Sequence, residues 1–397
     1  MIFVVYLFLI LNLIFVESEL VALFTLSRHG FRYPCNNILD LNISKSDCSL
    51  KEKGHEQLQR LGRAFIQEYP FISNLTENQV YFRSTGMSRT LNSALAFSLG
   101  AFNKSYRPAY SMPFQNDHLL KASSKCERFE NYYEQSVDSL MNHFTTKFDD
   151  KLTSLDYELS QDRSEMSFYF KACDVILNEE YIRTSLLEFR PLCKEILNFK
   201  HYQVYQDPNL SLFKGQLLAQ HLVDTFSSIR QCLSTSKREK FTFPYYSESS
   251  MNFFDASFYR NNCPRLVSYF SHDSTISLLL HYLNAHDGYL IMVFFSNIPV
   301  EAYTLIVELH RFDERDFRIL FKFNNNTKDF HNLETKICQP LCRLDDFIQL
   351  ISDRSDISID DMCSMSKHVH HYKIYIALLS AFFLLAIYFD TNIITYH

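Results

Sequence analysis

Apolar strands and helical repeats alternate along the first quarter of this chain. Leu20–Leu26 is a continuous apolar, β-rich run, which predicts a strand buried on both faces. From Leu50 to Tyr69 the apolar residues recur at the helical spacing. Asn78–Phe82 then predicts a second strand, and Arg89–Leu99 predicts a second helix. This alternation is typical of an α/β sheet.

The same pattern returns late in the chain. Val267–Phe270 predicts a third strand, and Ser274–Tyr282 predicts the helix that follows it. Thr304–Arg311 and Arg318–Phe323 have the pattern of a late strand pair.

The residues between these two parts have a different character, mostly charged with a helical period. We therefore predict an α/β fold, a three-layer sheet domain with helices on both faces and an inserted, mostly helical smaller domain. The core would comprise residues 19–107 and 249–366, and the insertion residues 108–248.

The N-terminus is apolar from Met1 to Val16 and continues into small residues at Val16-Glu17-Ser18. An apolar run of this length is short for a membrane span and fits a signal peptide over residues 1–18. The alternative is a buried N-terminal helix.

A second apolar run covers residues 374–389 and is followed by a short polar ending. We interpret it as the transmembrane anchor of a single-pass type I membrane protein, in the lysosome or at the cell surface. A GPI signal with its small residues at Ser364-Met365-Ser366 is one alternative, and a buried helix is the other.

Composition narrows the function. The 397 residues are 47% hydrophobic, with 39 Lys and Arg against 45 Asp and Glu, for a net charge of −6. This is globular composition, and it argues against a disordered chain and against a general nucleic-acid binder. Only 7 residues are glycine, which argues against glycine-rich phosphate loops.

Cysteines and sequons agree with a secreted protein. The chain has 10 cysteines, an even number. Cys35 and Cys48 bracket one short polar loop and are expected to pair; Cys338 and Cys342 fit a local disulfide better than a metal knuckle. Glycosylation sequons lie at Asn42, Asn74, Asn103, Asn209 and Asn325.

Charged and histidine clusters follow the predicted strands. The first strand is followed by Arg28, His29 and Arg32, the second by Arg83, and the third by His272 and Asp273. Ligands of open α/β sheets bind at the carboxyl ends of the strands, and arginine matches the tetrahedral phosphate group. Taken singly, Arg83 also fits a surface ion pair, and His272-Asp273 an ordinary helix start. Together the clusters predict a phosphate site.

These motifs also resemble a known family. Leu26-Ser-Arg-His-Gly-Phe-Arg-Tyr-Pro34 resembles the R-H-G-x-R-x-P signature of the histidine acid phosphatases, clade 2 of the histidine phosphatase superfamily. Val80-Tyr-Phe-Arg-Ser-Thr85 with Arg89-Thr90 resembles the family's second phosphate-binding segment, and Ser271-His-Asp-Ser-Thr275 its H-D motif. The resemblance runs from about residue 20 to Cys363 and is strongest to prostatic and lysosomal acid phosphatases.

The resemblance implies a role for each residue. His29 would be the nucleophile that forms a phosphohistidine, and Asp273 would protonate the leaving alcohol. The phosphate oxygens would be bound by Arg28, Arg32, Arg83 and His272. Substrates would be small phosphate monoesters, hydrolysed without cofactor or metal. Arg89 is interpreted as structural.

An acidic working pH is expected, because Asp273 must be protonated to act as the acid and its ordinary pKa is about 3.9. His272 would be cationic there. A backbone acceptor on one ring nitrogen of His29 would leave the other nitrogen free to attack.

The resemblance also implies disulfides between Cys126 and Cys363 and between Cys338 and Cys342, and leaves the pairing of Cys173, Cys193, Cys232 and Cys263 open. One alternative function is a specialised phytase or sugar-phosphate phosphatase. Another is a catalytically inactive, membrane-anchored binding protein of the same fold. The natural substrate and a possible homodimer stay open.

Overall fold

The structure is a computed structural model. It describes residues 18–35, 47–103, 107–113, 117–121, 127–159, 166–180, 182–205, 208–234, 262–284, 300–333, 335, 337–338 and 341–354. The predicted signal peptide and the apolar run at 374–389 lie outside these residues. Within them, no helix has the length and apolar character needed to cross a bilayer.

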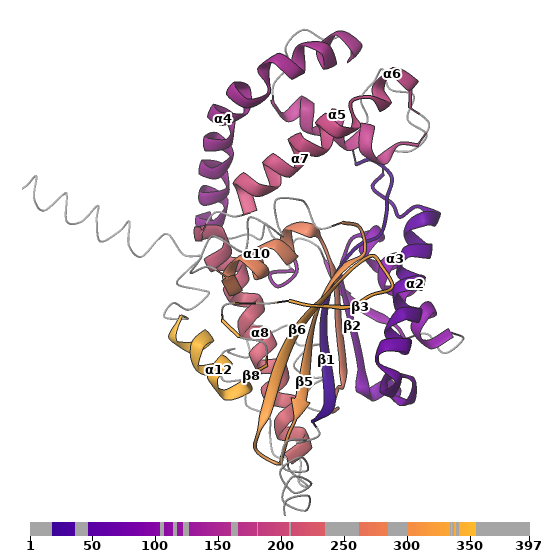
Figure 1. The fold of residues 1–397 in the computed structure, drawn as a ribbon, viewed down its shortest axis with the longest axis vertical. Helices are drawn as coiled ribbons and strands as arrows, with labels where there is room; N and C mark the ends of the chain where they lie inside the picture. Colours follow the sequence, from indigo (N-terminus) through magenta and orange to yellow (C-terminus); the bar gives the residue numbers. More distant parts are fainter. Residues whose placement is uncertain are drawn as a thin grey trace, which may run out of the picture.

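A central sheet organises the described chain (Figure 1). Its strands follow the order β3-β2-β4-β1-β5-β6-β7, with β8 paired to β6. β1, β2, β3 and β4 are parallel, whereas β5 and β6 run antiparallel to β1 and to each other. The strands are β1 (Glu19–Arg28), β2 (Val80–Thr85), β3 (Ala109–Met112), β4 (Leu266–Ser271), β5 (Tyr303–Arg311), β6 (Phe317–Asn325), β7 (His331–Asn332) and β8 (Cys342–Arg343).

Helices cover both faces of the sheet, as the α/β prediction requires. α2 (Glu52–Glu68) and α3 (Ser88–Phe102) pack on one face, with the short η1 (Pro70–Asn74) and η2 (Glu77–Gln79) leading into β2. α8 (Pro208–Ser234), α10 (Asp273–Asn284) and α12 (Leu344–Asp353) pack on the other.

Residue alternation in β1 explains this layering. Leu23 and Phe24 are both fully buried but point to opposite faces, so that Leu23 joins the core under α2 and α3 and Phe24 joins the core under α8 and α10. A strand buried on both sides reads as the continuous apolar run seen in the sequence.

A further group of helices lies beyond the ends of β1, β2 and β4 (Figure 1). It consists of α4 (Glu127–Leu159), α5 (Met166–Asn178), α6 (Thr184–Leu187) and α7 (Arg190–Tyr205) and has a hydrophobic cluster of its own. From the same stretch of sequence, β3 pairs with β2 in the sheet. α8 belongs to both parts, because Leu210 and Phe213 at its start join the cluster of this helical group, whereas its residues from Leu217 onward pack on the sheet.

Disulfides occur at the predicted Cys35–Cys48 and Cys338–Cys342 pairs. The four cysteines whose pairing the sequence left open form two disulfides, Cys173–Cys193 and Cys232–Cys263. Cys126 and Cys363 lie outside the described residues. Disulfides indicate an extracellular or secretory-pathway protein. Four of the sequon residues are exposed, namely Asn74, Asn103, Asn209 and Asn325, while Asn42 lies outside the described part.

One core carboxyl has an unusual environment. Asp224 in α8 is buried, and within the described chain neither of its carboxyl oxygens has a hydrogen-bond partner. Burial raises the pKa of Asp224 to about 8. The unfolded chain releases this proton at about pH 4. Between about pH 4 and pH 8 the folded state therefore holds a proton that the unfolded state has lost, and stability falls as pH rises.

We expect Asp224→Asn to weaken this pH dependence, because the amide does not titrate. The difference in slope should approach about 1.4 kcal/mol per pH unit, measured by urea unfolding at pH 5 and pH 7.5. Ser228→Ala, at a buried polar residue of the same helix, serves as control and should keep the wild-type slope. An unchanged slope in Asp224→Asn would contradict the prediction.

Candidate active site

The two histidines of the sequence motifs follow neighbouring strands. β1 and β4 are parallel and adjacent, with Arg28 opposite Ser271. The His29 amide extends this ladder by donating to the Ser271 carbonyl at 3.1 Å. His29 and His272 therefore leave the sheet side by side, and their ring centroids lie 5.7 Å apart.

Gly30 explains why the first motif needs a residue without a side chain. A Cβ atom at Gly30 would lie 2.5 Å from the Gly54 carbonyl oxygen in α2. The Gly30 amide also donates to Ser93 Oγ in α3 at 3.1 Å. This close approach fixes the end of β1 against both helices, and with it the position of His29.

His29 is in a state suited to nucleophilic attack. Its Nδ1–H donates to the Gly30 carbonyl at 2.8 Å, which is the backbone acceptor expected from the sequence. Burial, together with the positive charges of Arg28 and Arg89, holds the pKa of His29 well below its ordinary value. The ring is therefore neutral, with its proton on Nδ1 and the lone pair on Nε2.

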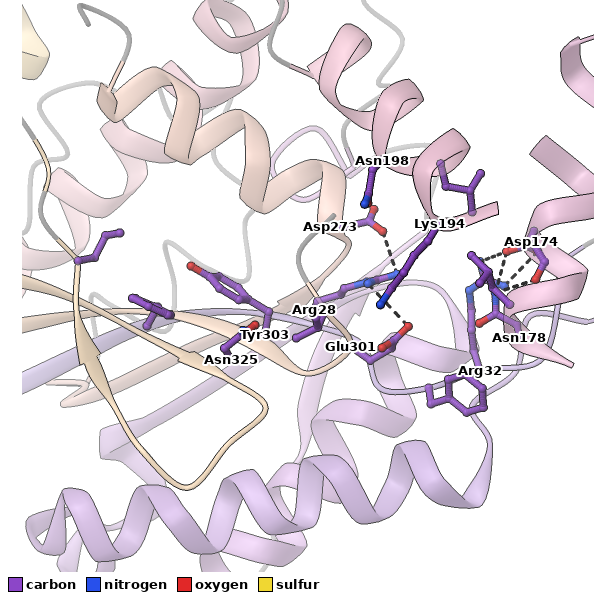
Figure 2. A pocket seen from close by; sticks show the side chains of 16 residues that line it. Arg28, Arg32, Asp174, Asn178, Lys194, Asn198, Asp273, Glu301, Tyr303 and Asn325 are labelled. Atoms are coloured by element: carbon purple, nitrogen blue, oxygen red, sulfur yellow. Dashed lines mark hydrogen bonds and ion pairs between the residues drawn. The ribbon is translucent and has the colours of Figure 1, made fainter. Parts of the chain in front are cut away.

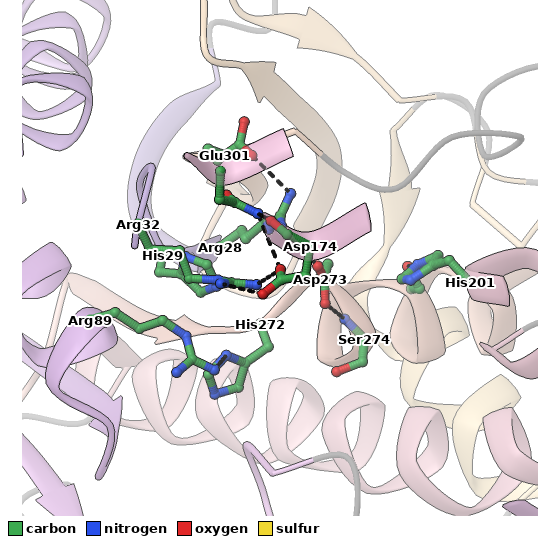
Figure 3. Close-up of polar contacts among 12 residues, drawn as sticks. Arg28, His29, Arg32, Arg89, Asp174, His201, His272, Asp273, Ser274 and Glu301 are labelled. Carbon is green, nitrogen blue, oxygen red and sulfur yellow. Dashed lines mark hydrogen bonds and ion pairs between the residues drawn. The ribbon is translucent and has the colours of Figure 1, made fainter. Parts of the chain in front are cut away.

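Arg28 and Asp273 form an ion pair beside this ring (Figure 3). Arg28 Nη2 lies 3.0 Å from Asp273 Oδ2, and Glu301 is a second, more distant partner at 3.9 Å. Asp273 Oδ1 accepts the Ser274 amide at 2.7 Å at the start of α10. Burial favours the neutral carboxyl, but the positive charge of Arg28 outweighs it and holds the pKa of Asp273 far below its ordinary value. In the free protein Asp273 is ionised.

Arg32 is held by a residue that the sequence did not single out. Its Nη2 lies 2.7 Å from Asp174 Oδ1 in α5. Asp174 also accepts the backbone amide of Cys35 at 2.9 Å. No spacing along the chain relates Asp174 to the R-H-G motif, because the helical stretch brings it there only through the fold.

Arg83 does not lie where the sequence placed it. The predicted strand ended at Phe82, but β2 continues to Thr85, so Arg83 lies inside the strand opposite Tyr269 rather than beyond its end. Its guanidinium is fully buried against Asp117, at 2.7 Å. This contact makes Arg83 an ion-pair residue, in the core rather than on the surface, and favours that interpretation over the expected role as a phosphate ligand.

Arg89, interpreted from the sequence as structural, is the arginine that joins the cluster. It lies in the first turn of α3, just past the end of β2, and its Nη2 donates to His272 Nδ1 at 3.3 Å. Its Nε and Nη1 are buried, with no hydrogen-bond partner in the described chain. Burial and repulsion from Arg32 lower the pKa of Arg89 to about 10. Unsatisfied buried guanidinium donors are costly without an anion to receive them.

His272 orients Arg89 rather than adding a charge. Because Nδ1 accepts from Arg89, the ring proton is on Nε2, which lies 3.2 Å from Thr85 Oγ1. Burial and the charge of Arg89 lower the pKa of His272 to about 3. In the free protein His272 is therefore neutral, in contrast to the cationic state expected at the working pH.

A cavity of about 570 Å³ opens beside this cluster (Figure 2). One wall is α7, which presents Lys194 and Asn198, and the other is formed by β5 and β6. The rest of its lining combines polar residues with apolar or aromatic ones. The polar residues are Arg28, Arg32, Asp174, Asn178, Asp273, Glu301 and Asn325, and the apolar or aromatic ones are Phe31, Leu177, Leu197, Val300, Tyr303, Phe323 and Leu333. A smaller cavity of about 440 Å³ on the other side of Arg32 and Asp174 is lined by Lys171, Lys200 and His201 among others. No group of three or more His, Cys, Asp or Glu in the described residues could hold a metal ion.

Comparisons with known proteins agree with this arrangement. The sequence profile of the histidine phosphatase superfamily (branch 2) matches residues 40–321, well over half of the chain. The Caenorhabditis elegans protein named "Putative acid phosphatase 5" is 23% identical, over 78% of this chain and 70% of that protein.

Solved structures show the same fold. The Citrobacter braakii phytase superposes with a TM-score of 0.60 at 14% identity, over 88% of this chain and 100% of that one. The Hafnia alvei phytase gives 0.58 at 10% identity, over 86% and 98%. The Bifidobacterium longum multiple inositol polyphosphate phosphatase gives 0.55 at 10% identity, over 87% and 94%.

Mutation should distinguish the structural role of Arg83 from the phosphate-binding role of Arg89. Arg83→Met leaves the Asp117 carboxylate buried without its partner, and we expect it to lower the free energy of unfolding by about 3–5 kcal/mol. Arg89→Met removes buried, unsatisfied donors, so stability should be kept while affinity for inorganic phosphate falls about 10- to 100-fold. Urea unfolding and calorimetric phosphate titration measure the two effects. The assignment would be contradicted if Arg83→Met and Arg89→Met lost the same stability. It would also be contradicted if Arg83→Met folded normally and were the one variant with weaker phosphate binding.

Proposed function

Since this chain belongs to the histidine phosphatase superfamily, branch 2, we propose that it is an acid phosphatase that hydrolyses phosphate monoesters through a phosphohistidine on His29. The observation that carries the proposal is the state of His29. It is a neutral imidazole whose proton is fixed on Nδ1 by the Gly30 carbonyl, among the charges of Arg28, Arg32 and Arg89. A neutral nucleophile in a cationic surrounding suits attack on an anionic phosphate.

The arginines would supply the electrostatic part of catalysis. The positive charges of Arg28, Arg89 and Arg32 all lower the pKa of His29, which supports a shared electrostatic role for these three guanidinium groups near its ring. Negative charge in phosphoryl transfer spreads over the three equatorial oxygens, and a fixed set of donors stabilises it without reorganisation. In this proposal Arg89 takes the role that the sequence had given to Arg83.

Asp273 is proposed as the general acid, although it is ionised in the free protein. Its low pKa results chiefly from Arg28. A substrate phosphate bound by Arg28 would take up that guanidinium's charge and add its own negative charge nearby. Burial then dominates, and the pKa of Asp273 rises. Substrate binding would thus help to protonate its own acid.

Hydrolysis would proceed in two steps. The Nε2 lone pair of His29 attacks phosphorus, the ester P–O bond breaks, and the leaving oxygen takes the proton of Asp273. Water then attacks the phosphohistidine, the P–N bond breaks, and the proton of that water returns to Asp273. The products are an alcohol and inorganic phosphate, and the protein is restored.

The cavity favours esters with a single phosphate over inositol polyphosphates. Beyond Arg28 and Arg32, the described lining of the larger cavity offers one further cation, Lys194, against Glu301 and several apolar side chains. The alternative is a phytase, and it is favoured by the smaller cavity, where Lys171 and Lys200 could face additional phosphates.

Asp273→Asn should show a leaving-group dependence. The arginines and His29 remain, but the leaving oxygen loses its proton donor, which is worth about 10²–10⁴-fold in rate. We expect a large loss for alkyl phosphates and a smaller one for nitrophenyl phosphate, whose leaving group is already acidic. Single-turnover kinetics isolate the first step. The same factor for both substrates would contradict the role of Asp273.

The pH profiles should differ between free protein and complex. The kcat/KM profile reports groups of the free protein and kcat those of the complex. Because the pKa of Asp273 is lowered in the free protein and substrate relieves the cause, the rate should fall with rising pH at a higher pH for kcat than for kcat/KM. In Asp273→Asn, which keeps the titration of the substrate, this difference should disappear. If kcat and kcat/KM of the wild type fall at the same pH, the mechanism is contradicted.

A further inference from the structure

One of the sequons lies at the edge of the proposed active site. Asn325 is the last residue of β6 and begins the sequon Asn325-Asn326-Thr327. It is exposed and lines the 570 Å³ cavity together with Arg28 and Asp273. Figure 2 places its side chain beside Tyr303, on the strand side of the cavity.

The alternation of β6 sets the direction of this side chain. Asn324 is fully buried, and its amide donates to the carbonyls of Thr327 and Asp329 at 3.0 and 2.9 Å. Asn325 must therefore point to the opposite face of the strand. That face also carries Phe323, which lines the same cavity.

The cross-strand partner confirms this direction. Tyr303 pairs with Asn325 in the β5–β6 register, and its ring stacks on Phe323 at a centroid distance of 5.9 Å. Tyr303 and Phe323 form part of the cavity wall, and Asn325 continues that wall to the surface. A group attached to Asn325 Nδ2 would therefore begin at the mouth of the cavity.

The disulfides of the chain are typical of proteins that pass through a compartment where such a group is added. Its disulfides indicate the secretory pathway, where sequons receive N-linked glycans. Thr327 is exposed as well, so the sequon as a whole is accessible on the surface.

We propose that an N-linked glycan on Asn325 stands at the mouth of the catalytic cavity and restricts the site to small phosphate esters, excluding phosphoproteins. This rests on the proposed phosphatase activity. A glycan is bulky, hydrated and tethered to the rim, so it occupies the space before the cavity rather than its interior. A small ester passes such a group, whereas a polypeptide must lie across the mouth to present a phosphorylated side chain.

Two of the other three exposed sequons provide an internal comparison. Asn74 ends η1, which precedes β2, and Asn103 follows α3, so both lie toward the amino ends of the parallel strands. Neither lines the two cavities of the site. Removing a glycan there changes the surface of the protein without changing the mouth.

The first test is occupancy. The protein expressed through a eukaryotic secretory pathway is digested, and glycopeptides are identified by mass spectrometry before and after enzymatic deglycosylation in heavy-oxygen water. We expect a glycan on Asn325 that is absent from Thr327→Ala and present in Thr327→Ser. An unmodified Asn325 in the wild type would overturn the proposal.

The second test compares a small and a large substrate. Thr327→Ala removes the sequon without touching a cavity-lining residue, and Asn74→Gln removes a distant sequon as the matched control. We expect Thr327→Ala to raise kcat/KM for phosphorylated casein several-fold while nitrophenyl phosphate changes less than the casein rate. Asn74→Gln and Thr327→Ser should match the wild type for both.

The outcomes separate the two proposals. If every form hydrolyses nitrophenyl phosphate but Thr327→Ala gains nothing on casein, the size restriction is wrong and the phosphatase activity stands. The same gain in Asn74→Gln would also overturn the restriction, since it would point to a general surface effect. If no form hydrolyses nitrophenyl phosphate, the phosphatase activity fails, and the size restriction fails with it.

Discussion

The crowding of guanidinium groups at the ends of β1 and β2 is the constraint on which the site depends. Arg28, Arg32 and Arg89 surround two buried histidines, and each depresses the pKa of its neighbours. Like charges are held together only when the fold forces them or when anions compensate them. Here Asp273 and Asp174 compensate Arg28 and Arg32, whereas Nε and Nη1 of Arg89 have no partner in the described chain.

This arrangement links the free and the substrate-bound states. The carboxylate of Asp273 occupies, in the free protein, the partner position at Arg28 that a phosphate would take in the complex. Exchange of one anion for the other would leave the proton of Asp273 available where the leaving group departs. The parallel strands, the close contact at Gly30 and the start of α10 hold these groups in place. The scaffold therefore positions the charged groups. The proposed chemistry follows when phosphate replaces the Asp273 carboxylate as the partner of Arg28.

Strand ends were predictable from the sequence because apolar runs end where polar clusters begin. His29 and His272 lie one residue beyond the ends of β1 and β4, and Asp273 lies two residues beyond the end of β4, as predicted. Arg83 was misplaced because the burial of a charged residue in β2 depends on Asp117, which no local pattern reveals. Asp174, Lys194 and Asn198 were missed because α5 and α7 reach the site only through tertiary packing. A backbone acceptor for the His29 ring was expected from the sequence, but only the structure identifies it as the Gly30 carbonyl.

The most direct measurement traps the covalent intermediate. The protein is mixed with an aryl phosphate carrying labelled phosphorus, quenched in alkali, where a phosphohistidine survives, and mapped by peptide mass spectrometry. The label should lie on His29, persist in His272→Ala and vanish in His29→Ala. Label on any other residue, or turnover with no labelled protein at rapid quench, would contradict a phosphohistidine on His29.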